Sequence, residues 1–247
     1  MTALLEVRDI EKAFGGVQAV RGVSFDVHEG EILGVIGPNG SGKSTLFNCI
    51  LGQLLPGKGQ VRVDGRDVTG LRPSQLNRLG VSRTFQLLQV FPQLTARENL
   101  ILAGQEHRGS RLSRLFGARD AGLGTEADRM LAFFRLTALS GEKAGSLSYG
   151  QQKLLDAAMA FMAGSPLVLL DEPAGGVNPT MLGDLRERLE AVNRETRATF
   201  VVIEHNMEFV MALCSRLIVL AEGRIIAQGT PEQVRNDPVV IEAYLGH

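Results

Sequence analysis

The 247-residue sequence has only two cysteines, a net charge of −1 and no apolar run long enough to span a membrane. A membrane-spanning helix needs about 18 or more consecutive apolar residues, so other chains would have to supply any membrane attachment. Nucleic-acid binding proteins usually carry a marked basic excess, so the composition gives no reason to expect such a partner. The charges at Glu6, Arg8 and Asp9 do not fit a signal peptide.

The two cysteines, Cys49 and Cys214, lie in apolar helical patterns and have no zinc-site spacing. Small buried thiols in a reducing compartment explain them better than a disulfide does. A chain of this length is one large domain or two lobes and buries about 70 to 75% of its unfolded surface. We therefore expect a cytosolic protein with a substantial core.

What the sequence does contain is a phosphate loop, GPNGSGKST, at residues 37–45. An unalternating apolar strand is expected at 32–36 and a helix at 43–51, the context that such a loop requires. Glycines let backbone N–H groups approach phosphates, and the helix N-terminus adds partial positive charge. Lys43 would reach the outer phosphates and Ser44 would bind Mg²⁺. The expected ligand-binding residues are Gly37, Pro38, Asn39, Gly40, Ser41, Gly42, Lys43, Ser44 and Thr45.

Three short alternating segments, at 4–10, 23–27 and 61–63, predict a small antiparallel layer beside the phosphate loop. Phe14, one of few aromatic residues, follows the first of them. Its ring could stack on a purine base or pack in the core.

Acidic residues end the next buried strand, expected at 167–170. Asp171 is placed to hold magnesium, and Glu172 to orient and deprotonate an attacking water. The strand at 199–204 ends at His205, so all three side chains are expected at the ligand-binding edge of an α/β sheet. Capping of the following helix is the alternative for the acids, and a structural role is the alternative for the histidine.

Between these landmarks, a strand at 81–85 leads to Gln86, and Thr95 with Glu98 forms a capping box that opens a helix through Leu102. Residues 104–124 hold four arginines and five glycines and predict a mobile basic loop, either solvated or in contact with lipid head groups or a membrane partner. Ser148 and Gln151 form another capping box, before a helix to about residue 163. With Gly150, this helix start is a second place suited to phosphate.

These residues, in this order, resemble the landmarks of the ATP-binding cassette (ABC) ATPases along nearly the whole chain. In addition to the phosphate loop, the matches are a Q-loop glutamine at Gln86, the signature at 147–151, the acidic pair, a D-loop at 174–178 and a switch histidine at His205. The resemblance implies an α/β phosphate-loop NTPase with a mixed or parallel core sheet, an antiparallel β-layer and an α-helical signature subdomain. One domain is expected over 1–247, with a core lobe at about 1–86 and 166–230, a helical subdomain at about 87–165 and C-terminal helices at about 231–247.

The same resemblance implies a head-to-tail dimer that binds ATP and Mg²⁺. Ser148, Gly150 and Gln151 of one subunit would close over the ATP that the partner's phosphate loop holds. Catalysis would involve Glu172, His205 and Gln86, the metal would be bound by Ser44, Gln86 and Asp171, and Phe14 would stack on adenine. Two positions depart from the usual pattern: Tyr149 replaces a glycine, and Asn178 stands where many members have aspartate.

Within the family, the chain looks most similar to the ATPases of branched-chain amino-acid importers. The similarity lies in the signature LSYGQ, the segment AGGVNP, the 104–124 insertion and the ending VIEAYLG. It implies a homodimer or a heterodimer with a similar ATPase, two transmembrane permease subunits, an indirect solute-binding partner and a place on the cytoplasmic face of the inner membrane. Importers of urea or amides and the lipopolysaccharide export ATPase are alternatives.

Two other classes are less consistent with the sequence. Soluble ABC proteins that act on ribosomes or DNA usually have two cassettes or a long coiled coil, and the chain has neither an internal repeat nor a heptad insertion. A nucleotide-binding regulator without turnover would not need both Glu172 and His205.

Overall fold

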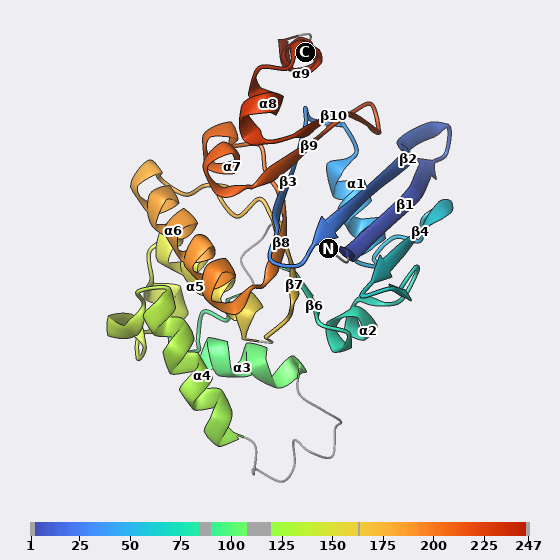
Figure 1. The fold of residues 1–247 in the computed structure, drawn as a ribbon. Helices are drawn as coiled ribbons and strands as arrows, with labels where there is room; N and C mark the ends of the chain where they lie inside the picture. The colour runs from blue at the N-terminus through green and yellow to red at the C-terminus, as the bar shows by residue number, and fades with distance from the viewer. Residues whose placement is uncertain (1–2, 84–89, 108–119, 163, 246–247) are drawn as a thin grey trace.

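The computed structural model describes residues 3–83, 90–107, 120–162 and 164–245. Its centre is a six-stranded sheet in the order β10-β9-β3-β8-β7-β6 (Figure 1). Only β9 and β10 pair in antiparallel fashion, so the sheet is mixed, as predicted. The strands are β3 (Ile32–Ile36), β6 (Val81–Arg83), β7 (Leu167–Asp171), β8 (Thr199–Ile203), β9 (Arg216–Ala221) and β10 (Arg224–Gly229).

The central strands are buried on both faces, which explains why their sequences are continuously apolar. In β3, Leu33 and Val35 enter one hydrophobic core, whereas Ile32 and Ile36 enter the other. A parallel strand in this position needs apolar residues on both sides.

The first core lies between the central sheet and a four-stranded antiparallel sheet in the order β2-β1-β4-β5. These strands are β1 (Ala3–Phe14), β2 (Val17–His28), β4 (Lys58–Val63) and β5 (Arg66–Asp67), and helix α1 (Lys43–Ile50) packs in the same core. The predicted antiparallel layer is confirmed, and Asp64 and Gly65 form its β4–β5 turn.

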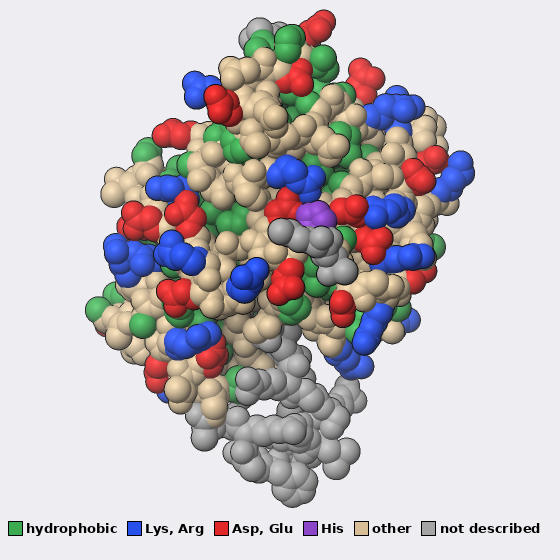
Figure 2. Space-filling model, in the orientation of Figure 1, with side chains coloured by type: hydrophobic (Ala, Val, Ile, Leu, Met, Phe, Trp, Pro, Cys, Tyr) green, Lys and Arg blue, Asp and Glu red, His purple; other side chains and the backbone are tan. Residues whose placement is uncertain are grey.

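Helices cover the other face of the central sheet, where they build the second core (Figure 1). The contributing helices are α3 (Ala96–His107), α4 (Asp120–Phe133), α5 (Tyr149–Phe161), α6 (Pro179–Thr196), α7 (Met207–Leu213), α8 (Pro231–Arg235) and α9 (Pro238–Leu245). Helix α2 (Pro73–Arg78) precedes β6, and two 3₁₀ turns, η2 (Thr137–Leu139) and η3 (Ala144–Ser146), precede α5. On the visible face, acidic and basic side chains are interspersed rather than segregated (Figure 2).

The prediction of a loop over 104–124 is wrong at both ends, because α3 continues to His107 and α4 begins at Asp120. A Cβ at Gly104 would lie 2.7 Å from the Leu123 side chain, and one at Gly124 would lie 2.7 Å from the Arg97 guanidinium. These glycines therefore permit close packing of α3 and α4 rather than a turn. The central part of the predicted loop, 108–119, lies outside the described residues.

Candidate functional site

The phosphate loop connects β3 to α1 as predicted, and two of its glycines are required by close backbone contacts. A Cβ at Gly37 would collide with the backbone oxygen of Leu220, and one at Gly42 with that of Ala19. At Gly40 the same atom would meet nothing within 4 Å. Helix α1 begins without a side-chain cap or an acidic residue in its first turn, so its first N–H groups can donate hydrogen bonds to an anion.

Lys43 lies across the phosphate loop and is almost fully buried. Its Nζ donates to the backbone oxygens of Gly37 at 2.8 Å and Pro38 at 2.9 Å. Burial lowers the pKa of Lys43, and the charge of Glu172 opposes this shift. The ammonium group is thus held where a polyphosphate would contact the loop.

The predicted acidic pair lies at the carboxyl end of β7, next to the ends of β8 and β6. The Asp171 carboxylate forms an ion pair with Arg83, with Nη2 2.6 Å from Oδ2. Glu172 has a positive φ of 48°, and its N–H donates to Ile203 O at 2.9 Å. This backbone turn carries the chain away from the sheet at the site.

His205, the predicted switch histidine, lies beside Glu172 at this edge. His205 Nδ1 is 3.8 Å from Glu172 Oε1 and 3.9 Å from Glu204 Oε2, both outside hydrogen-bond range. The imidazole is 60% exposed, compared with 28% for the Glu172 side chain. The structure therefore brings Asp171, Glu172 and His205 together, as expected from two adjacent parallel strand ends.

Sequence analysis missed Glu204, which is the best-buried acid at the site. One oxygen accepts from Ala174 N–H at 2.6 Å, and the other accepts from His205 N–H at 3.0 Å and Asn206 N–H at 3.1 Å. Burial raises the pKa of Glu204, and these hydrogen bonds partly offset the rise. The signal that could have identified Glu204 in the sequence was an acidic residue directly after an apolar strand.

Arg83 was also missed, although a basic residue within an otherwise buried strand was visible in the sequence. Its guanidinium contacts Gln53 Oε1 at 2.7 Å and Asn48 Oδ1 at 3.3 Å as well as Asp171. It therefore connects β6 and α1 to the acidic end of β7.

The signature residues lie apart from the phosphate loop of the same chain. Helix α5 packs on the helical face of the central sheet, whereas α1 packs on the opposite face. Ser148 is the N-cap of α5: Gln151 N–H donates to its Oγ at 3.4 Å, and its own N–H donates to Gln151 Oε1 at 2.9 Å. A Cβ at Gly150 would approach Met181 to 3.0 Å. The predicted capping box is confirmed.

The remaining candidates have different outcomes. Phe14 ends β1 and is 48% exposed as a residue, so the alternative of core packing is wrong. Lys12 Nζ lies 5.4 Å from the ring centroid. Gln86 lies outside the described residues, and so do the three residues that follow it, 87–89. In the next part of the chain, Val90 is partly buried against the helical core and Phe91 is exposed.

A magnesium ion fits the oxygen donors at this edge if phosphate supplies its other ligands. Ser44 offers a hydroxyl at the start of α1, and Asp171 offers a carboxylate already paired with a cation. Over the described ranges, no group of three or more His, Cys, Asp and Glu side chains could hold a metal by itself. Mg²⁺ typically uses one or two protein ligands together with substrate phosphates.

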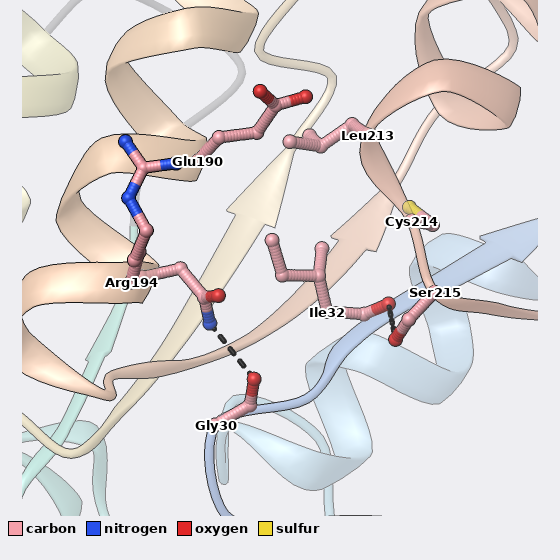
Figure 3. Close-up of a pocket in the computed structure, with 8 residues that line it drawn as sticks. Gly30, Ile32, Glu190, Arg194, Leu213, Cys214 and Ser215 are labelled. Carbon is pink, nitrogen blue, oxygen red and sulfur yellow. Dashed lines mark hydrogen bonds between the residues drawn. The ribbon is translucent and has the colours of Figure 1, made fainter.

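A pocket of about 370 Å³ lies at the opposite, amino end of β3, between α6 and α7 (Figure 3). Cys214 is among its lining residues, but burial raises the pKa of this thiol to about 12. Asn193 Nδ2 donates to Gly30 O and Ser215 Oγ donates to Ile32 O, so these polar groups are already satisfied. We therefore assign the site to the phosphate-loop edge instead.

Comparisons with known proteins agree with this geometry. The model of the ABC transporter family matches residues 20–175, and that of the branched-chain amino acid ATP-binding cassette transporter matches residues 224–247. The high-affinity branched-chain amino acid transport ATP-binding protein BraF of Pseudomonas aeruginosa is 39% identical over 98% of both chains.

Solved structures give the same result. The ADP conformation of MJ1267, an ATP-binding cassette of an ABC transporter, superposes with a TM-score of 0.89 at 35% identity and covers all of both chains. The dimeric structure of MJ0796, a bacterial ABC transporter cassette, has a TM-score of 0.78 at 26% identity and covers 92% of this chain and 98% of that one.

Proposed function

The chain belongs to the ABC transporter family, and from this premise we propose that it is the ATP-hydrolysing subunit of an importer for branched-chain amino acids. The observation that carries the ATPase assignment is the meeting of Lys43, Glu172 and His205 at one edge of the central sheet. The solute class is supported by the similarity to BraF and by the match over residues 224–247.

At the proposed ATP site, residues 37–45 cradle the phosphates and Lys43 exchanges its loop carbonyl partners for phosphate oxygens. Ser44 and Asp171, with Gln86, would hold Mg²⁺, which when bound draws charge from the phosphates. Glu172 orients and deprotonates water, and His205 lies beside it to contact the reacting phosphate region. The exposed ring of Phe14 stacks on adenine.

The signature residues act on the ATP of a second subunit. Ser148, Gly150 and Gln151 begin a helix on the opposite face of the central sheet from α1, so a head-to-tail dimer gives them a phosphate to bind. The dimeric structure of the MJ0796 cassette supports the formation of a dimer. We propose that the helical part, about 87–165, moves relative to the core when this interface closes. The dimer is formed by two identical subunits or by this chain with a similar ATPase.

Two permease subunits would supply the membrane-spanning part, with a solute-binding protein acting indirectly. Over the described residues, no helix has the length and apolar character needed to cross a bilayer. The proposed location is the cytoplasmic face of the inner membrane, through contacts with the permeases. Phe91, exposed near the start of the helical part, is the proposed permease contact.

Reconstitution of the chain in liposomes with its co-purifying membrane proteins, and with the solute-binding protein added outside, tests the assignment. We expect uptake of radiolabelled leucine or valine that requires internal MgATP, with a Glu172→Gln subunit as the inactive control. Uptake of urea or amides instead would contradict the solute class but retain the transport ATPase. Absence of both nucleotide binding and hydrolysis would overturn the function.

A further inference from the structure

The D-loop, residues 174–178, is contacted on both sides by side chains of the same subunit. On one side, Glu204 is fully buried at the end of β8 and accepts the Ala174 N–H at 2.6 Å. The other oxygen of the same carboxylate accepts the N–H groups of His205 and Asn206. One carboxylate therefore fixes the start of the D-loop and the backbone of the switch histidine together.

On the other side, Tyr149 extends from the first position of α5 over the two D-loop glycines. Its hydroxyl donates to Gly175 O at 3.4 Å. A Cβ at Gly176 would lie 2.9 Å from Cε1 of the ring, and Gly176 also has a φ of +71°. Lys153, one turn further along α5, has its Nζ 6.0 Å from the same ring centroid. The ring thus occupies the space that a side chain at Gly176 would need.

These contacts form one continuous connection from the signature helix to the switch histidine. It runs from Tyr149 to the Gly175 carbonyl, back along the main chain to the Ala174 N–H, and from there through Glu204 to the His205 N–H. His205 Nδ1 is in turn 3.8 Å from Glu172. In the proposed dimer, the signature acts on the partner's ATP, whereas His205 and Glu172 act on the subunit's own ATP.

We propose that Tyr149 and Glu204 are positioning residues that hold the D-loop between them and so link the signature helix of each subunit to its own switch histidine. The inference rests on the proposed function. Only in the head-to-tail dimer do the signature helix and His205 of one subunit act on two different ATP molecules. Neither side chain is assigned a contact with ATP. Their effect is on the placement of His205 and Glu172, and hence on kcat rather than on nucleotide binding.

Replacing a single oxygen atom of the Glu204 carboxylate should be enough to weaken this link. A carboxylate offers two accepting oxygens, and the three backbone groups that bond to Glu204 within the described ranges are N–H donors. In Glu204→Gln, an amide NH₂ replaces one oxygen at nearly unchanged volume and faces a donor. The variant thus breaks one side of the link without creating a cavity.

Steady-state ATPase kinetics test the catalytic part of the proposal. For Glu204→Gln, we expect kcat to fall by at least about tenfold while KM for ATP changes by less than about twofold. Glu208→Gln is the matched control, because it removes a carboxylate from the exposed first turn of the adjacent α7. A Glu204→Gln enzyme with the kcat of the control would overturn the proposal.

Variants of Tyr149 test the signature-helix end of the link. Tyr149 is exposed, so these substitutions do not disturb the hydrophobic core. Tyr149→Gly removes the ring from Gly176 and should lower kcat more than Tyr149→Phe, which removes only a long hydrogen bond. The double variant Tyr149→Gly/Glu204→Gln should lose less than the product of the two single losses, since both break one link. Strictly multiplicative losses would show that the two residues act independently.

Hydrogen exchange of the isolated, nucleotide-free protein separates this inference from the proposed function. Tyr149→Gly should accelerate exchange at the amides of His205 and Asn206, on the far side of the D-loop, relative to the wild type. Unchanged exchange at these amides rejects the link, whatever the ATPase activity. A wild-type protein without ATPase activity, but with this exchange response, would contradict the proposed function and retain the link.

Discussion

Arg83 Nη2 lies 2.6 Å from Asp171 Oδ2, and both side chains are largely buried, with exposed fractions of 14% and 7%. The proposed magnesium ligand is therefore paired with a cation before any metal binds. The same guanidinium contacts Asn48 and Gln53 on the α1 side of the sheet. Arg83 thus relates the position of Asp171 to the helix that begins in the phosphate loop.

Removing this cation should destabilise the protein and increase the rise in Tm that MgATP causes. Arg83→Met leaves the Asp171 carboxylate less compensated, at an expected cost of about 3 to 5 kcal/mol. MgATP should raise the Tm of the variant more than that of the wild type, because the ion supplies nearby positive charge. Differential scanning calorimetry with and without MgATP measures both effects. Equal MgATP shifts in the two proteins would contradict the expected role of Arg83.

Glu172→Gln should preserve ATP binding and lower turnover by roughly 10² to 10⁴, because the general base is lost and the phosphate cradle stays intact. The variant should also accumulate as an ATP-bound dimer. Fluorescent-nucleotide binding and sedimentation with MgATP check the two parts. A monomer with normal turnover would rule out the assignment of Glu172.

Ser148 is expected to act in trans. A Ser148→Arg subunit and a Lys43→Ala subunit should each be inactive as homodimers, the second because it loses its main phosphate contact. Mixing them should restore one composite site per heterodimer. Hydrolysis by the mixture, compared with each variant alone, measures this complementation. No gain on mixing would contradict a head-to-tail arrangement in which single sites can act alone.

A charge at Phe91 should uncouple transport from hydrolysis. The Phe91 backbone is fixed by Asn99, which accepts its N–H at 2.7 Å and donates to its carbonyl oxygen at 3.1 Å, while the ring remains exposed. Phe91→Asp should abolish solute uptake and permease-stimulated hydrolysis with little change in the basal ATPase rate. Leu55→Asp, at another exposed apolar position, is the control. Normal uptake by folded Phe91→Asp would reject the permease contact.

Both cysteines should resist thiol reagents while the protein is folded. Burial raises the pKa of Cys49, and burial together with the charge of Glu204 raises that of Cys214 from 9.0 to about 12. The stabilising effect of the neutral Cys214 thiol is therefore complete below about pH 9 and is lost as the pH rises toward 12.

A colorimetric thiol titration at pH 8 tests this, with the denatured protein as the control. We expect two reactive thiols after denaturation and very slow reaction before it. Rapid modification of either cysteine in the folded protein would contradict the burial of these side chains.

Sequence patterns predicted the elements whose signals are local. The unalternating run at 32–36, the capping boxes at Thr95 and Ser148 and the Asn178-Pro179 helix start are all present. Each depends on residues within a few positions of one another, so the sequence contains the whole interaction. The placement of Asp171, Glu172 and His205 at one edge also followed, because parallel strands bring their carboxyl ends together.

Glycine was misinterpreted where its role was not local. Gly104 and Gly124 suggested a loop, but they face Leu123 and Arg97 across the α3–α4 contact. A sequence pattern does not distinguish a glycine that turns the chain from one that admits a neighbouring helix. Phe14 posed a similar choice between core and surface, which its exposure decides.

By itself, the sequence determined the phosphate loop, the order of the family landmarks and the alternation of strands and helices. Only the tertiary structure decided that Arg83 pairs with Asp171, that Glu204 joins Ala174 to His205, and that Tyr149 lies on Gly176. Arg83 and Asp171 are 88 positions apart, and Glu204 and Ala174 are 30 apart. Such pairs meet only after the strands have assembled, because burial on both faces of the sheet fixes their register and leaves these polar groups to satisfy one another.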